Sequence, residues 1–154
     1  MGISILWPTF ALVGLMFIVY LMMFVKRFGH IRANPPKDAD LATGEAALRY
    51  FEPVEMPANN YRNLFEMPVL YFALVPLLLI TGHDSLTQMV LAWVYVGLRY
   101  VHSFVHIGPK KVPVRALLFS LSALVLLAMW IGFAVDIASV KPVLDGVTEN
   151  PVAV

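Results

Sequence analysis

Long apolar stretches alternate with shorter polar ones along this chain. Each apolar stretch has about the 20 residues that an α-helix needs to cross a bilayer. The stretches lie at about 3–25, 60–80, 85–107 and 113–137. The pattern predicts an all-α integral membrane protein, with a single four-transmembrane-helix bundle over residues 1–140. Residues 141–154 carry few large apolar side chains and are predicted to form a loose C-terminal tail.

The polar stretches predict how the spans are connected. The first connection, over residues 28–58, is long, and its adjacent prolines disfavour a continuous helix through it. A short surface helix is predicted within it, at residues 40–51. The second connection is a tight turn, and Asp84 or Ser85 is predicted to cap the helix that follows.

The basic residues predict the orientation of the spans. Of the eleven Lys and Arg residues, six lie between Lys26 and Arg62, four between Arg99 and Arg115, and one is Lys141. Basic residues concentrate in cytoplasmic loops of membrane proteins. The first and third loops are therefore predicted to be cytoplasmic, and both termini to lie on the non-cytoplasmic side.

Composition supports a membrane protein and excludes several functions. Of the 154 residues, 60 % are hydrophobic and 14 % are charged, and the mean hydropathy is +0.77. Soluble domains carry about 25 % charged residues. With no cysteine, the chain has no disulfide, no thiolate metal site and no cysteine nucleophile. It also lacks a basic block with interleaved aromatic residues, so nucleic-acid binding is not expected.

Polar side chains open the second apolar stretch. Arg62 and Glu66 are four residues apart and Asn63 and Glu66 are three apart, so on one helix all three would share a side. Charges within a span are costly and commonly face the interior of a bundle, where they mark a site. The alternative interpretation is an interfacial ion pair that neutralises itself.

The third and fourth stretches carry polar residues at a matching depth. Arg99, His102 and His106 follow the i, i+3, i+7 spacing of one helix face. At about 1.5 Å of rise per residue, His102 and Glu66 each lie about 9 Å below the cytoplasmic ends of their spans. Arg115 occupies the first turn of the fourth span. We therefore expect these residues, with Arg62 and Asn63, to converge in the cytoplasmic third of the bilayer.

The predicted cluster suits an anionic ligand. Three arginines face one glutamate, and the planar guanidinium group matches carboxylate or phosphate. Glu66 and Asn63 are suited to hold an ammonium group, so a small peptide with two carboxylates and one amine fits this inventory. Arg115, at a helix start where the backbone is also partially positive, favours a thiolate over a thiol in the ligand.

These residues resemble the MAPEG family, the membrane-associated proteins in eicosanoid and glutathione metabolism. The resemblance rests on Arg62-Asn63-Leu64-Phe65-Glu66, on Arg99-Tyr100-Val101-His102 and on Arg115, sixteen residues after Arg99. It covers about residues 5–137 and includes Ala33-Asn34-Pro35 in the first loop.

The resemblance to bacterial-type members implies a homotrimer that binds glutathione, as co-substrate, between protomers near the cytoplasmic face of a bacterial inner membrane. It implies that Arg62, Asn63 and Glu66 hold the polar ends of glutathione, and that Arg99 and His102 help to line the pocket. His106, on the same face of the third span, is a further candidate binding residue. Arg115 would stabilise the thiolate for attack on a lipophilic electrophile arriving through the lipid. Lys26 or Arg27 matches a basic residue at the end of the first span that takes part in family sites.

The chain departs from the family pattern at three positions. Many members have an arginine where this chain has Asn59, and a tyrosine where it has His106. Pro68 also comes earlier than the equivalent proline of the eicosanoid enzymes. These departures bear on glutathione affinity and turnover, while the fold expected from the resemblance is unchanged.

The sequence also bears on functions other than that of a glutathione-dependent enzyme. A metal site is not expected, because His102 and His106 have only Glu66 within reach as a further ligand. A second possibility is a non-catalytic structural or accessory subunit, in which the polar cluster holds helices in register. A transporter is disfavoured, because four spans without an inverted repeat offer little machinery for alternating access. The environment of Arg115 distinguishes an enzyme from an accessory subunit. An enzyme needs Arg115 directed into an open pocket, whereas a structural subunit would pair it with a carboxylate or a lipid phosphate.

Overall fold

The protein is described by a computed structural model that covers residues 5–109 and 111–139. Its helices are α1 (Leu6–Ala33), α2 (Gly44–Phe51), α3 (Met56–Asn63), α4 (Pro68–Thr81), α5 (Leu86–Ile107) and α6 (Val112–Ala138), with 3₁₀ turns at Asp38–Asp40 and Glu52–Val54. Four segments are long and apolar enough to cross a membrane: α1, α3 with α4, α5 and α6. The predicted all-α, four-span fold is confirmed. The predicted tail, 141–154, lies outside the described residues.

The second span is broken just before Pro68, one of the two prolines at which the sequence predicts bends. Residues 64–67 form turns between α3 and α4, so Arg62 and Glu66 do not share a helix face, and that prediction was wrong. Pro68 explains the break: it has no N–H for the carbonyl of Leu64, and its ring would clash with that carbonyl. As the first residue of α4 the same proline is favourable.

The first span continues beyond the apolar stretch. The sequence placed its end at Lys26 and Arg27, but α1 runs on to Ala33. The helix stops at Asn34, whose N–H bonds to the carbonyl of His30 at 2.8 Å, directly before the two prolines. The surface helix predicted for 40–51 begins later, at Gly44.

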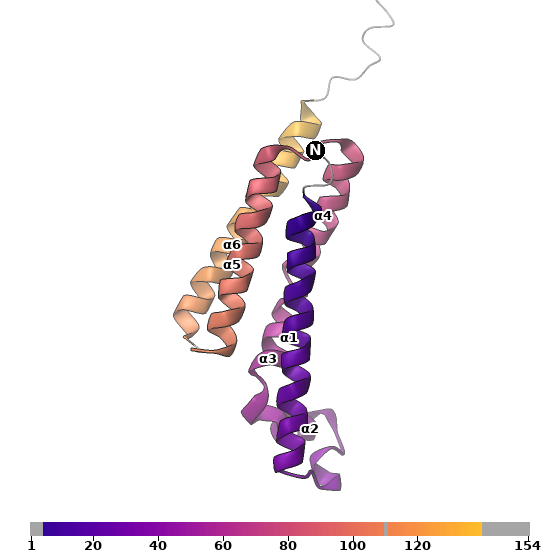
Figure 1. Cartoon of the computed structure of the whole chain (residues 1–154), viewed down its shortest axis with the longest axis vertical. Helices are drawn as coiled ribbons and strands as arrows, with labels where there is room; N and C mark the ends of the chain where they lie inside the picture. Colours follow the sequence, from indigo (N-terminus) through magenta and orange to yellow (C-terminus); the bar gives the residue numbers. More distant parts are fainter. Residues whose placement is uncertain (1–4, 110, 140–154) are drawn as a thin grey trace, which may run out of the picture.

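The helices form two layers that run along one long axis. Figure 1 shows α5 and α6 side by side, with α1 alongside α3 and α5. The short α2 lies at the end of α1 that is opposite the α4–α5 turn. At that turn Gly82 has a φ of 69°, and His83 donates its N–H to the carbonyl of Leu78 at 2.9 Å. This left-handed cap reverses the chain, and Ser85, as predicted, caps α5 by accepting from the Gln88 N–H at 3.3 Å.

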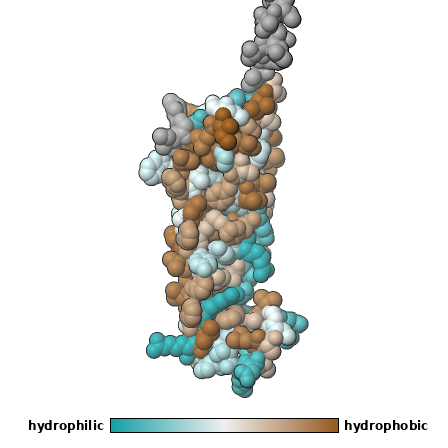
Figure 2. Space-filling view, turned by 90° about the vertical axis from the view of Figure 1, so that its right-hand side faces the viewer, coloured by the Kyte–Doolittle hydropathy of each residue, from teal (hydrophilic) through white to brown (hydrophobic). Residues whose placement is uncertain are grey.

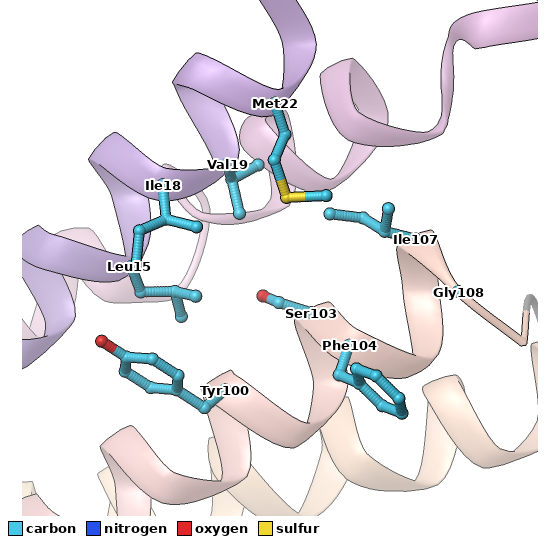
Figure 3. Close-up of a pocket in the computed structure, with 9 residues that line it drawn as sticks. All are labelled: Leu15, Ile18, Val19, Met22, Tyr100, Ser103, Phe104, Ile107 and Gly108. Carbon is cyan, nitrogen blue, oxygen red and sulfur yellow. The ribbon is translucent and has the colours of Figure 1, made fainter. Parts of the chain in front are cut away.

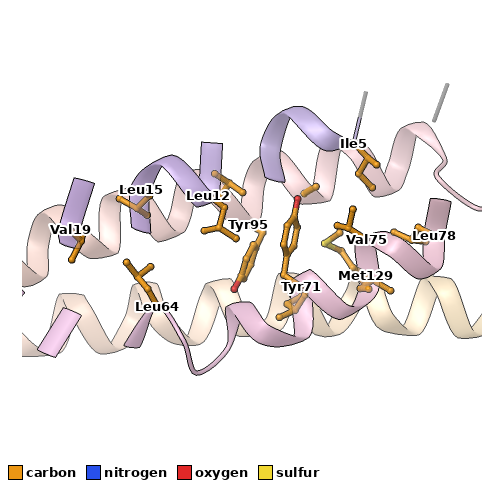
Figure 4. Packing of buried hydrophobic residues seen from close by; sticks show 14 residues of the cluster. Ile5, Leu12, Leu15, Val19, Leu64, Tyr71, Val75, Leu78, Tyr95 and Met129 are labelled. Carbon is orange, nitrogen blue, oxygen red and sulfur yellow. The ribbon is translucent and has the colours of Figure 1, made fainter. Parts of the chain in front are cut away.

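The core lies where α1, α4 and α5 meet. The rings of Tyr71 and Tyr95 stack at 5.2 Å between centroids, and Figure 4 shows them between the aliphatic side chains of α1 and α4. The Tyr71 hydroxyl shares a hydrogen bond of 3.1 Å with the Thr9 hydroxyl, which satisfies both groups inside the membrane span. These contacts fix α4 against α1 and α5.

Apolar side chains cover most of the outer surface. Large hydrophobic residues such as Trp7, Phe17, Ile80 and Phe104 are exposed on the helices. Figure 2 shows apolar residues along most of the molecule and hydrophilic groups gathered toward its lower end. A soluble monomer rarely exposes so continuous an apolar surface. The protein is therefore a multi-pass integral membrane protein.

Candidate functional site

Segments far apart in the sequence meet around one polar cavity. They are the end of α3, the turn that follows it, the second half of α5 and the first turns of α6. The cavity has a volume of about 290 Å³. It is lined by Asn63, Glu66, His102, Arg115, Ala116, Phe119 and Ser120. Four of these, Asn63, Glu66, His102 and Arg115, were predicted from the sequence. Glu66 lies in the turn after α3 and still lines the cavity.

Arg115 is anchored to the wall of the cavity by a histidine. Its Nη1 lies 3.1 Å from Nε2 of His106, and the same Nε2 lies 3.3 Å from Nδ2 of Asn63. His106 is 2 % exposed, whereas Arg115 is half-buried. One imidazole therefore connects the end of α3 to the first turn of α6, and the remaining guanidinium donors of Arg115 stay available for a ligand.

Arg99 lies behind this wall and is fully buried. Its Nη2 donates to the backbone carbonyl of Asn63 at 2.8 Å, and its guanidinium lies 5.6 Å from the ring centroid of Phe119. The Asn63 carbonyl is in the last turn of α3, where the continuing helix no longer satisfies it. Arg99 thus fixes the backbone of the residue that lines the cavity, without lining it.

Buried polar groups continue from the cavity toward α1. Ser103 donates to Oδ1 of Asn60 at 3.4 Å, and both side chains are buried. The sequence analysis missed this pair, and it missed Ala116, Phe119 and Ser120 of α6. Phe119 could have been found from Arg115, because the i+4 position lies on the same side of a helix.

Of the predicted site residues, Arg99 and His106 lie behind the cavity wall without lining it, and three more lie away from the cavity of a single protomer. Arg62 and Lys26 are exposed. Arg27 is held elsewhere: its Nη2 contacts both carboxylate oxygens of Glu55, at 3.2 and 3.0 Å, and its guanidinium lies 4.8 Å from the ring centroid of Phe51. Arg27 therefore fastens the long first connection to α1. Across residues 5–109 and 111–139, no group of three His, Asp or Glu side chains is placed to hold a metal ion.

Two apolar grooves lie near the cavity. One, of about 280 Å³ between α4 and α6, is lined by Met67, Leu70, Ala123, Leu126, Leu127 and Trp130. Ala123 is one helical turn beyond Phe119, so this groove borders the polar cavity along α6. The other, of about 290 Å³, lies between α1 and α5, and Figure 3 shows Tyr100, Ser103, Phe104 and Ile107 of α5 beside it. Tyr100 and Phe104 occupy a different face of α5 from His102 and His106.

The comparisons with known proteins gave one match. The model of the MAPEG family matches residues 5–135, which include all four spans except the last three residues of α6. No curated protein and no solved structure matches the chain.

Proposed function

This chain belongs to the MAPEG family, which includes glutathione-dependent transferases and related proteins, and from that premise we propose that it is a glutathione-dependent membrane transferase or peroxidase. Glutathione binds in the cavity between Asn63, Glu66 and Arg115. Arg115 holds its sulfur as a thiolate, and the thiolate attacks a lipophilic electrophile that arrives through the bilayer.

One observation carries this proposal: Arg115 lines an open cavity and makes no ion pair within the described part of the chain. The ion pairs there are Arg27–Glu55 and Arg49–Glu45. A scaffold that used Arg115 to hold helices in register would pair its charge, because an unpaired cation in a membrane span is costly. Its partner is instead a ring nitrogen of His106, which leaves the charge to be neutralised by an anion.

The chemistry of the cavity matches that of glutathione. Glutathione offers two carboxylates, one ammonium group and a thiol. The guanidinium of Arg115 supplies donors for an anionic group. The Glu66 carboxylate, in the same cavity, supplies a counter-ion for the ammonium group. The Asn63 amide has both a donor and an acceptor, so it can hydrogen-bond the peptide part of the ligand.

The arrangement also accounts for activation of the thiol. When the thiol loses its proton to water, the negative charge on sulfur faces Arg115 and the first turn of α6, where unsatisfied N–H groups make the helix end partially positive. Both stabilise the thiolate relative to the thiol. The sulfur lone pair then forms a bond to the electrophilic atom of the second substrate, which releases its leaving group or, after addition, takes up a proton.

The groove between α4 and α6 supports a lipophilic second substrate. Its lining is apolar, it lies within the membrane-spanning part of both helices, and it borders the cavity at Phe119. An apolar molecule dissolved in the lipid reaches this groove without crossing water. Its reactive atom would then meet the sulfur where the groove joins the polar cavity.

The proposal includes a homotrimer in a bacterial inner membrane, with glutathione bound between protomers on the cytoplasmic side. In this arrangement we expect the exposed Arg62 and Lys26 to contact a ligand held by the neighbouring copy. The apolar outer faces of the helices supply the contacts between copies.

Glutathione is expected to stabilise the purified protein. A ligand that binds only the folded state adds about 2.7 kcal/mol to the free energy of unfolding at a concentration 100 times its dissociation constant. The measurement is a thermal melt against glutathione concentration, in a detergent that keeps the oligomer intact. Cysteinyl-glycine, which lacks the γ-glutamyl carboxylate, is the matched control and should give a much smaller shift. No shift with glutathione would refute glutathione binding, and equal shifts with both would refute recognition of its γ-glutamyl group.

A further inference from the structure

The contacts of His106 fix the position of its proton. Nε2 lies 3.1 Å from Nη1 of Arg115, and a guanidinium group has donors only. A hydrogen bond at this distance therefore requires an acceptor lone pair on Nε2. A neutral ring with its proton on Nδ1 meets this requirement, and Nδ1 itself has no hydrogen-bond partner among the described residues. The Asn63 amide agrees with this, because its Nδ2 approaches the same lone pair at 3.3 Å.

We propose that His106 is a positioning residue that holds Arg115 at the cavity through the lone pair of its neutral ring, and that protonation of the ring releases Arg115. His106 thereby acts as an acid-sensitive latch on the residue to which the proposed function gives the thiolate. The tautomer of His106 does not depend on the proposed function. The effect of His106 protonation on glutathione binding rests on that proposed function.

The surroundings of His106 explain why a protonated ring cannot keep the contact. Protonation would place an N–H on Nε2, so that it faced the N–H of Arg115, donor against donor. The charged groups that act on the ring are Arg115 from α6 and Arg99 from its own helix α5, and Glu66, from the turn after α3, lines the same cavity as Arg115. His102 is a further titratable neighbour on α5, with its ring centroid 5.7 Å from that of His106, and α3 contributes the uncharged Asn63. A protonated His106 would therefore be a third positive charge near two arginines and one carboxylate.

The latch ties Arg115 to the rest of the bundle. Arg99 bonds to the Asn63 carbonyl, the Asn63 side chain bonds to His106, and His106 bonds to Arg115. Among the described residues, His106 is the one hydrogen-bond partner of the Arg115 side chain. Loss of the lone pair on Nε2 therefore frees the guanidinium to leave the cavity wall, while the cavity itself remains.

The first test is independent of glutathione. The protein is labelled with ¹⁵N-histidine, and the ring nitrogens are observed by NMR near neutral pH. The chain has four histidines, and the His106 signal is identified by its loss in His106→Gln. We expect an unprotonated Nε2 and a protonated Nδ1. A proton on Nε2, or on both nitrogens, overturns the inference even if glutathione binds.

The second test distinguishes a hydrogen-bond acceptor at position 106 from a side chain that only fills the space. The side-chain oxygen of His106→Gln can accept from Arg115 but does not titrate, and His106→Phe fills the space without an acceptor. At neutral pH we expect His106→Gln to bind glutathione within a few-fold of wild type and His106→Phe to bind about tenfold more weakly, the loss of one charge-assisted hydrogen bond. On acidification from pH 7.5 to 5, wild-type affinity should fall toward that of His106→Phe, while His106→Gln stays flat.

His30→Gln is the matched control, because His30 lies on α1 beside Tyr50, away from the cavity. It should keep the pH dependence of wild type. If His106→Gln loses affinity at acid pH as wild type does, or if His106→Phe binds as well as His106→Gln, the latch is refuted. If no variant binds glutathione, the proposed function fails, and the NMR measurement still decides the tautomer.

Discussion

Replacement of Arg115 by alanine is expected to abolish the thiolate form of bound glutathione. The variant removes the donors that face the sulfur, and loss of one preorganised donor to a developing negative charge slows catalysis about 10²–10³-fold. The thiolate is measured by its ultraviolet absorbance in a difference spectrum of the complex. Conjugation to a lipophilic electrophile is measured in parallel.

Two further variants test whether loss of the thiolate signal is specific to the guanidinium group of Arg115. Arg115→Lys keeps the charge but loses the planar fork, so an intermediate thiolate signal is expected. Arg49→Ala removes an arginine whose pair with Glu45 is exposed, with the two side chains 71 % and 80 % accessible, and it should change neither signal. A thiolate signal that survives in Arg115→Ala would assign sulfur activation to another group.

Replacement of Arg99 by methionine is expected to separate binding from stability. Methionine is similarly long but uncharged, so the bond to the Asn63 carbonyl is lost and the end of α3 loosens. A hydrogen bond from a charged donor contributes about 1.5–3 kcal/mol, so glutathione affinity should fall about 10–100-fold. The free energy of unfolding should not fall with it, because Nε and Nη1 of Arg99 lack partners among the described residues and a buried, incompletely paired charge is costly.

The Arg99 prediction is checked by a glutathione titration and a thermal melt on the same preparation. Leu74→Ala is the matched control: Leu74 is fully buried, and its truncation should lower the free energy of unfolding by about 2–5 kcal/mol. If Arg99→Met lowers stability as Leu74→Ala does, then Arg99 is a packing residue, and its bond to Asn63 is incidental.

The number and order of the spans followed directly from the sequence, whereas the helix ends did not. Hydropathy reports the part of a helix that lies in lipid, so it marked Lys26 as an end although α1 continues to Ala33. Two prolines lie in the second span as predicted, at about 60–80, and only Pro68 begins a new helix. Pro76 stays within α4, where neighbouring helices compensate for its missing hydrogen bond. Composition alone does not distinguish it from Pro68.

The candidate site was predictable as a set of residues and not as a set of contacts. The i, i+3, i+7 spacing placed Arg99, His102 and His106 on one face, and all three lie at or behind the cavity. Their partners depend on the break in the second span. Because α3 ends at Asn63, its carbonyl is free to accept from Arg99, and Arg62 is left facing outward. A helix that continued through Met67 would have satisfied that carbonyl internally.

A structure determined at saturating glutathione, with the oligomer intact, tests the central claim most directly. The account predicts one glutathione in the cavity of each protomer, with its sulfur within hydrogen-bond distance of the Arg115 guanidinium and its ammonium group against Glu66. An empty cavity, or glutathione bound with its sulfur remote from Arg115, would contradict it.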